Sequence, residues 1–199
     1  ACIFELGNWV IWQALQDATE IRRIIPDFII NVNIAAPQLE RPDFHYEVLN
    51  ALHDTGYPPQ NLCLELTERC RELDTDFLRG EIEFFRSNGI RVAMDDFGTG
   101  NASLQLILEL PLDEIKIDRE FIRDLEKDKS RIIIRNTIAM LQQLGVHIVI
   151  EGVETEEQKS FLLGCGCTDA QGFLFHRPMP VEAFDALLLQ QECEYDRTK

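Results

Sequence analysis

Six short runs of β-branched and apolar residues alternate with longer segments of helical periodicity, and this alternation limits the possible folds more than any other feature. The runs are Phe28–Ile34, Leu62–Thr67, Arg91–Asp95, Glu114–Ile117, Val146–Ile150 and Thr168–Gly172. Runs that are apolar on both faces, such as Val146–Ile150, are typical of parallel strands covered by helices. No linker or low-complexity stretch interrupts the pattern, so the sequence predicts one α/β domain over residues 1–199.

Apolar residues at helical spacing occupy the segments between the runs. The stripes are Val10/Ala14/Ala18/Ile21, Phe44/Val48/Leu52, Leu73/Phe77/Ile82/Phe85, Ile134/Ile138/Leu141/Leu144 and Val181/Phe184/Leu188. Thr155 and Gln158 form a capping-box sequence at the start of a further helix, and Gly56 and Gly145 are expected to end two others. These helices are predicted to cover the strands.

A hydrogen-bonding or charged residue stands at the end of every strand run. These residues are Asn33, Glu65, Asp95 with Asp96, Lys116, Glu151 and Gln171. Functional groups at the carboxyl end of every strand are typical of a (β/α)8 barrel, whereas an open doubly wound sheet gathers them at one switch point. We therefore predict a modified TIM-like (β/α)8 barrel. Because such barrels have eight strands and usually ~250 residues, we expect the first two strands to lie upstream of this chain.

Five of the strand-end residues offer only oxygen ligands. Asn33, Glu65, Asp95, Asp96 and Glu151 suit Mg²⁺ or Mn²⁺, and adjacent aspartates can bridge two ions. Without cations, so many carboxylates at one barrel mouth would repel one another. Taken singly, each residue has an ordinary structural explanation, such as capping the following helix. Taken as a set, they predict a two-metal site.

By strand alternation, Lys116 is expected to point to the same face of the sheet as the carboxylates. Two interpretations stay open: it serves the site by holding a water or a phosphoryl oxygen, or it forms a structural ion pair with Asp113 or Asp118. In the first interpretation, two ions and a lysine indicate hydrolysis of a phosphodiester. The glycine-containing loop at 96–100 is either a mobile segment beside the site or an ordinary turn.

Composition excludes several classes of partner. The chain has 19 basic and 35 acidic residues, which gives a net charge of −16. This balance argues against a nucleic-acid duplex or an anionic membrane as the main partner. No apolar run approaches the ~18 residues of a membrane-spanning helix. The 6 cysteines lack metal-ligand spacing and are expected to be reduced thiols in the cytoplasm.

Several segments, in this order and spacing, resemble the EAL-domain cyclic di-GMP phosphodiesterases. They are INVNIAAPQL, LCLELTE, VAMDDFGTGNASL, LPLDEIKIDREFI, VIEGVET and DAQGFLFHRPMP, and they cover essentially the whole chain. The resemblance implies a modified (β/α)8 barrel that hydrolyses cyclic di-GMP to linear pGpG with Mg²⁺ or Mn²⁺. It also implies bacterial second-messenger signalling, a homodimer, and sensor or diguanylate cyclase-like domains in a longer protein that could be membrane-attached.

The resemblance also implies roles for individual residues. Asn33, Glu65 and Asp95 would bind one metal, while Asp95, Asp96 and Glu151 would bind the second. Lys116 would hold the attacking water, and Glu151 would contribute to its activation. Glu68 would anchor the loop after Asp96, and Gln171 would line the site near the substrate or its water.

This sequence departs from the family pattern in two places. The signature Glu-Ala-Leu, whose glutamate ligates a metal, is not present, so we expect the 199-residue chain alone to be nearly inactive and prone to associate. Asn101 and Ala102 stand where the family usually has Tyr-Ser, in a loop linked to dimerisation. The leading hypothesis is a phosphodiesterase domain. The alternative is a catalytically silent domain that binds cyclic di-GMP and signals through a protein partner.

Overall fold

All six predicted runs form strands of one parallel sheet. The computed structural model describes residues 2–67, 70, 72–98 and 104–197. The strands are β1 (Ile30–Ile34), β2 (Leu62–Leu66), β3 (Arg91–Phe97), β4 (Glu114–Ile117), β5 (His147–Ile150) and β6 (Asp169–Ala170). They are hydrogen-bonded in sequence order, each parallel to the next. This sequential parallel order is the one found in (β/α)8 barrels, as predicted.

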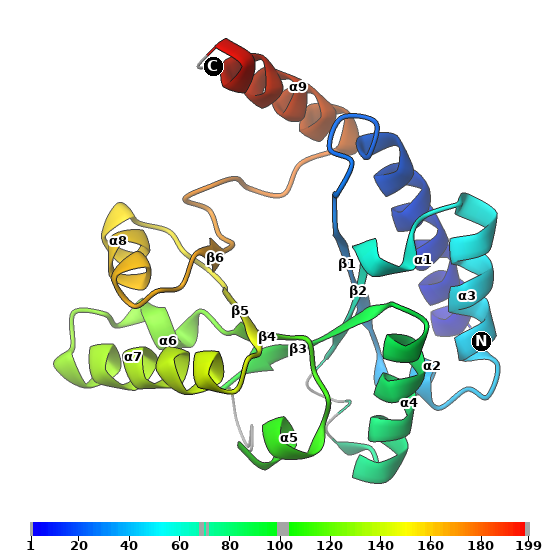
Figure 1. Cartoon of the computed structure of the whole chain (residues 1–199), viewed down its shortest axis with the longest axis horizontal. Coiled ribbons are helices and arrows are strands. Elements are labelled where there is room, and N and C mark those ends of the chain that lie inside the picture. Colours follow the sequence, from blue (N-terminus) through cyan, green and yellow to red (C-terminus); the bar gives the residue numbers. More distant parts are fainter. Residues whose placement is uncertain (1, 68–69, 71, 99–103, 198–199) are drawn as a thin grey trace.

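Helices flank the strands, and those that connect successive strands lie outside the arc that the strands form (Figure 1). They are α1 (Cys2–Ile21), α2 (Ala36–Leu39), α3 (Phe44–Thr55), η1 (Pro59–Asn61), α4 (Thr75–Ser87), α5 (Leu104–Glu109), α6 (Glu120–Arg123), α7 (Asp128–Gln143), α8 (Glu156–Gly164) and α9 (Val181–Arg197). Within the described ranges, none of the helices combines the length and the apolar character needed to cross a membrane.

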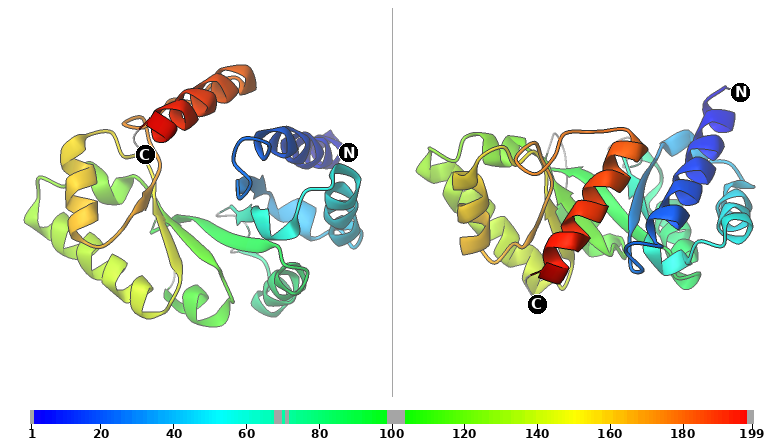
Figure 2. Two further views of the ribbon diagram at one scale, coloured as in Figure 1. Left: turned by 45° about the horizontal axis from the view of Figure 1, so that its top comes forward. Right: turned by 90° about the horizontal axis from the view of Figure 1, so that it is seen from above.

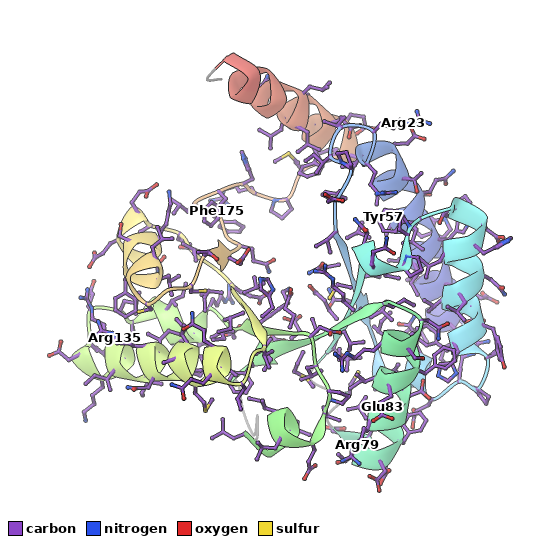
Figure 3. All side chains as sticks on the ribbon, in the orientation of Figure 1. Arg23, Tyr57, Arg79, Glu83, Arg135 and Phe175 are labelled. Atoms are coloured by element: carbon purple, nitrogen blue, oxygen red, sulfur yellow. The ribbon has the colours of Figure 1, made fainter. Side chains whose placement is uncertain are left out.

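The last helix lies across the open side of the arc. Both views in Figure 2 show α9 in the space between α1 and the β5–α8 region. The ring of Phe184 on α9 packs 6.1 Å from that of Phe28, which precedes β1. Tyr57, labelled in Figure 3, ties the same segment to the core, because its buried hydroxyl donates a hydrogen bond of 2.6 Å to the Phe28 carbonyl oxygen.

Strand alternation separates an apolar face from a polar face. Residues such as Ile34, Leu64 and Ile150 belong to the continuous hydrophobic core that the helices cover. Their neighbours along the strands point to the opposite face, because successive side chains in a strand alternate. On that face, register places Asn33 opposite Glu65. The polar strand-end residues therefore share the inner side of the arc.

Helix termini and cysteines agree with the sequence predictions. The Thr155 hydroxyl accepts a hydrogen bond from the Gln158 backbone N–H at the start of α8, and Gly56 ends α3 in a left-handed conformation with φ of 68°. Within the described part of the chain, Cys63, Cys70, Cys165 and Cys167 take part in no disulfide.

Most members of the predicted apolar stripes are buried, but a few are exposed. Val10 is 40% exposed, whereas its neighbour Ile11 is 2% exposed and packs in the core. The N-terminal half of α1 has apolar residues on more than one side, so two stripes fit a helical period equally well. Leu144 and Phe77 are also exposed, at 49% and 38%, because they lie at the end of α7 and in the first turn of α4.

Candidate functional site

Lys116 lies at the centre of the polar face and is only 4% exposed. Its Nζ is 2.6 Å from Glu151 Oε1, 2.9 Å from Glu65 Oε1 and 3.7 Å from Asp95 Oδ1. These carboxylates come from the ends of β5, β2 and β3, so four strands meet at one ammonium group. A buried cation among three carboxylates is a strong electrostatic arrangement because little water screens it.

The two aspartates considered as structural partners of Lys116 interact elsewhere. Asp113 pairs with Arg86, and it also accepts a hydrogen bond from the Val92 backbone N–H. Asp118 Oδ1 accepts a hydrogen bond of 2.7 Å from the Glu120 backbone N–H at the start of α6. The ion pairs of Lys116 are therefore those of the strand-end cluster.

The cluster changes the proton affinity of its members. Burial by itself would lower the pKa of Lys116, but the hydrogen bond to Glu151 and the charges of Glu65 and Asp95 outweigh it and raise that pKa. Burial raises the pKa of Glu151, although Lys116 opposes this change. Lys116 is consequently a permanent cation at neutral pH, and it can donate hydrogen bonds but cannot accept a proton.

The backbone bends sharply between the paired aspartates. Asp96 has φ of 53°, and among the described residues it is the one non-glycine residue with positive φ. Its backbone N–H donates a hydrogen bond of 2.9 Å to Asp95 Oδ1. Such a conformation costs of order 1–3 kcal/mol for a residue with a side chain, and it occurs mostly where function requires it. The bend lets both carboxylates face the inner side of the arc.

Three of the carboxylates form a group suited to a cation. Asp95, Asp96 and Glu151 each place an oxygen within 4.8 Å of the others. Together with Glu65, these four carboxylates carry more negative charge than the single charge of Lys116 can neutralise. Hard oxygen donors of this kind fit Mg²⁺ or Mn²⁺. By the chemistry of their donor atoms, these residues therefore fit a divalent cation.

The remaining predicted site residues lie at different distances from this group. Glu65 is 3% exposed and contacts Lys116, but it lies outside the group of three carboxylates. Asn33 is opposite Glu65 in the register of β1 and β2. Gln171 Nε2 donates a hydrogen bond of 2.5 Å to Glu151 Oε1. Glu68, together with Asn101 and Ala102 of the glycine loop, lies outside the described residues.

The sequence analysis missed Asn31. It lies on β1, two residues before Asn33, and its Nδ2 donates a hydrogen bond of 2.8 Å to Glu65 Oε1. The available signal was strand alternation, because a polar residue two positions from a candidate ligand must share its face. Asn31 therefore joins the site through Glu65.

A cavity of about 730 Å³ adjoins the carboxylates. Its lining includes Asp96, Asp118, Arg119, Glu151, Gly152, Glu154, Gln171, Gly172, Phe173, His176, Arg177, Pro178, Met179 and Phe184. The Arg177 guanidinium stacks 4.2 Å from the Phe173 ring centroid. The segment between β6 and α9, on which Figure 3 labels Phe175, contributes several of these residues. Acidic groups together with arginines and aromatic rings in one cavity suit a ligand that has phosphates and planar rings.

A second polar group lies on the inner face, nearer the start of the strands. His147 Nδ1 is 2.9 Å from Glu114 Oε2, and His147 Nε2 is 3.3 Å from Asp169 Oδ2. Burial by itself would lower the pKa of His147, but the two carboxylates outweigh it and raise that pKa above the ordinary 6.5. The imidazolium therefore connects β4 and β6 across β5.

This arrangement predicts pH-dependent stability. The ring is protonated in both the folded and unfolded states well below pH 6.5, so its contribution is complete there, and it is lost as the pH rises through the raised folded-state pKa. The contribution should be about 1 kcal/mol or less, because solvent screens a half-exposed pair. Urea unfolding of His147→Gln and the wild type across this range should show their difference shrinking as pH rises. A difference that is constant with pH would contradict the ion-pair role.

Comparison with known proteins identifies the family. The EAL domain family matches residues 1–178. MucR of Pseudomonas aeruginosa, a bifunctional diguanylate cyclase/cyclic di-GMP phosphodiesterase, is 38% identical over 185 residues, which are 90% of this chain and 27% of MucR. Cyclic di-GMP phosphodiesterase PdeR of Escherichia coli is 34% identical over 184 residues, which are 92% of this chain and 28% of PdeR. The chain thus spans less than a third of these curated relatives.

Solved structures agree with this assignment. The EAL domain of Mycobacterium smegmatis DcpA has a TM-score of 0.88 at 34% identity, and the match covers 94% of this chain and 85% of that one. The PaMucR phosphodiesterase in complex with cyclic di-GMP has a TM-score of 0.85 at 37% identity, over 92% of this chain and 75% of that one. The TIM-barrel-like fold predicted from the strand pattern is confirmed, and the chain belongs to the EAL domain family.

Proposed function

We propose that this chain is a divalent-metal-dependent phosphodiesterase domain that hydrolyses cyclic di-GMP to linear pGpG. One observation carries the proposal: a buried Lys116 joins the carboxylates of Glu65, Asp95 and Glu151 beside a cavity lined by arginines and aromatic rings. A receptor that only holds the nucleotide has no need for an ammonium group and an acidic cluster at the same point. The relatives named as cyclic di-GMP phosphodiesterases support the choice of substrate.

The proposed reaction is a hydrolytic displacement at phosphorus. The water oxygen forms a bond to one phosphorus atom and the bond from that phosphorus to the 3′ oxygen breaks, so the single linear product carries a 5′ phosphate and a 3′ hydroxyl. Mg²⁺ or Mn²⁺, held by Asp95, Asp96 and Glu151 with Asn33 and Glu65, would supply Lewis-acid stabilisation of charge on the oxygens. The protein side chains must orient the water and the phosphate and must move the protons.

The structure supports separate roles for Lys116 and Glu151. Because its pKa is raised, Lys116 stays protonated and can hold the water or stabilise negative charge on a phosphoryl oxygen. Glu151 is the candidate to accept the proton of the water, because its own pKa is raised from the usual value. Its Oε1 already contacts Lys116 Nζ and Gln171 Nε2, which fix the orientation of the carboxylate.

The proposed metal site is tested by Asp95→Asn. Replacing one carboxylate oxygen with an amide removes a charge from the group of Asp95, Asp96 and Glu151. Calorimetric titration with Mn²⁺ should show a loss of affinity greater than the roughly 10–100-fold that removal of an outer-shell partner causes. Asp76→Asn, at an exposed position on α4, is the matched control and should bind Mn²⁺ like the wild type. Unchanged affinity in Asp95→Asn would remove Asp95 from the site.

The activity itself is tested with a longer version of the domain that also carries a Glu-Ala-Leu strand, incubated with Mn²⁺ and cyclic di-GMP before the products are separated by chromatography. Formation of pGpG supports the proposed reaction. Binding of cyclic di-GMP without any product would instead support the alternative of a silent receptor domain that signals through a protein partner.

A further inference from the structure

Glu65 accepts two hydrogen-bond donors on a single oxygen. Asn31 Nδ2 lies 2.8 Å and Lys116 Nζ lies 2.9 Å from its Oε1. The amide must present its NH₂ group here, because its carbonyl oxygen would repel a carboxylate. Neither contact involves Oε2. The carboxylate is therefore held in one rotamer, from β1 on one side and from β4 on the other.

Glu151 shows the same pattern on the other side of the lysine. Its Oε1 is 2.6 Å from Lys116 Nζ and accepts a hydrogen bond of 2.5 Å from Gln171 Nε2. The side chains thus form a continuous row of amide, carboxylate, ammonium, carboxylate and amide. In this row, Asn31 donates a hydrogen bond to Glu65 just as Gln171 donates one to Glu151. The shared geometry leaves one oxygen of each carboxylate for another ligand.

We propose that Asn31 is a positioning residue that fixes Glu65 through Oε1, so that Oε2 would be available to a divalent cation. This inference rests on the proposed function, because it assumes that Glu65 helps to bind that cation. Outer-shell hydrogen bonds of this kind orient a ligand side chain before the metal binds, so less conformational freedom is lost on binding. Without the amide, only Lys116 holds Oε1, and the carboxylate can rotate about its terminal bond.

The test is Mn²⁺ titration of Asn31→Leu, which keeps the shape of the side chain and deletes the donor. We expect the affinity for Mn²⁺ to fall by about 10–100-fold. Asn50→Leu, the same chemical change at an exposed position on α3, is the matched control and should bind like the wild type. Asn31→Ala carries the same expectation if the leucine variant fails to fold.

Two further measurements separate positioning from a structural role. Thermal unfolding without metal should change little, whereas the rise in Tm that Mn²⁺ causes should shrink in Asn31→Leu. In a Glu65→Gln background, Asn31→Leu should cause no additional loss of Mn²⁺ affinity, because it acts only through Glu65. Additive losses in this double-mutant cycle would overturn the inference.

The outcomes also distinguish this inference from the proposed function. A wild type that binds Mn²⁺, together with an Asn31→Leu variant of equal affinity, would overturn the role of Asn31 alone. A wild type that does not bind Mn²⁺ would overturn the metal site and the role of Asn31 with it. Weakened binding in Asn31→Leu, with normal binding in Asn50→Leu, supports both.

Discussion

In a domain that also carries a Glu-Ala-Leu strand, Lys116→Met is expected to lower turnover of cyclic di-GMP by about 100-fold or more, the loss that follows removal of one stabilising group from a transition state. Methionine keeps the length of the side chain but removes the charge that joins Glu65, Asp95 and Glu151. Because the ammonium is proposed to act on the water or the phosphoryl oxygen, binding of cyclic di-GMP should persist. Product chromatography measures the turnover, and calorimetry measures the binding.

The same variant should also be destabilised, by about 3–5 kcal/mol, because removing one partner of a buried ion pair leaves the other charges uncompensated. Lys116 and Glu65 are both less than 5% exposed, so solvent does little to relieve them. Lys159→Met is the matched control, since Lys159 forms an exposed pair with Glu156 on α8 and should affect neither stability nor turnover strongly. Turnover near that of the wild type in Lys116→Met would show that the lysine is a structural ion pair only.

The fold was predictable because its signals are local and repeated. Each strand run is short, apolar and followed by a polar residue, and β4 matches its predicted limits of Glu114 and Ile117. The last strand was predicted from Thr168 to Gly172, but only Asp169 and Ala170 pair with β5. Gln171 still donates its backbone N–H to the Ile150 carbonyl oxygen, at 2.8 Å, so hydrogen bonding to the β5 segment continues one residue beyond the strand.

The candidate site was predictable where strand ends alone decide the position of a side chain. Asp95, Asp96 and Glu151 converge as their shared place at the barrel mouth implies. The ion-pair partners of Lys116 were harder to predict, because Asp113 and Asp118 are neighbours in sequence while Glu65 and Glu151 are neighbours only across strands. Register between strands is set by tertiary packing, so spacing along the chain left both interpretations open.

Asn31 and His147 were missed for the same reason. Each is a polar residue within or at the start of a largely apolar strand, and its interaction partner lies on another strand, far away in sequence. The partner of Asn31 is Glu65 on β2, and those of His147 are Glu114 on β4 and Asp169 on β6. A sequence pattern indicates which face such a residue occupies, but the contact exists only once the strands are in register.

Gly152→Ala is expected to destabilise the protein by about 2–4 kcal/mol and to lower turnover, because two penalties add at this position. Gly152 has φ of +69°, which costs a residue with a side chain roughly 1–2 kcal/mol. An added Cβ would also lie 2.3 Å from Arg119 Cβ, so the backbone must move. Since Gly152 directly follows Glu151, that movement would displace the carboxylate proposed to act as base.

Gly145→Ala separates the two penalties. Gly145 has a similar φ of +74°, but an added Cβ there meets no atom within 4 Å. This control variant should therefore lose only the roughly 1–2 kcal/mol of backbone strain and should keep its turnover, because Gly145 follows α7 and is remote from the carboxylates. Chemical denaturation and the pGpG assay, applied to both variants, measure the two effects. Equal losses of stability, with normal turnover in Gly152→Ala, would show that the contact with Arg119 relaxes without moving Glu151.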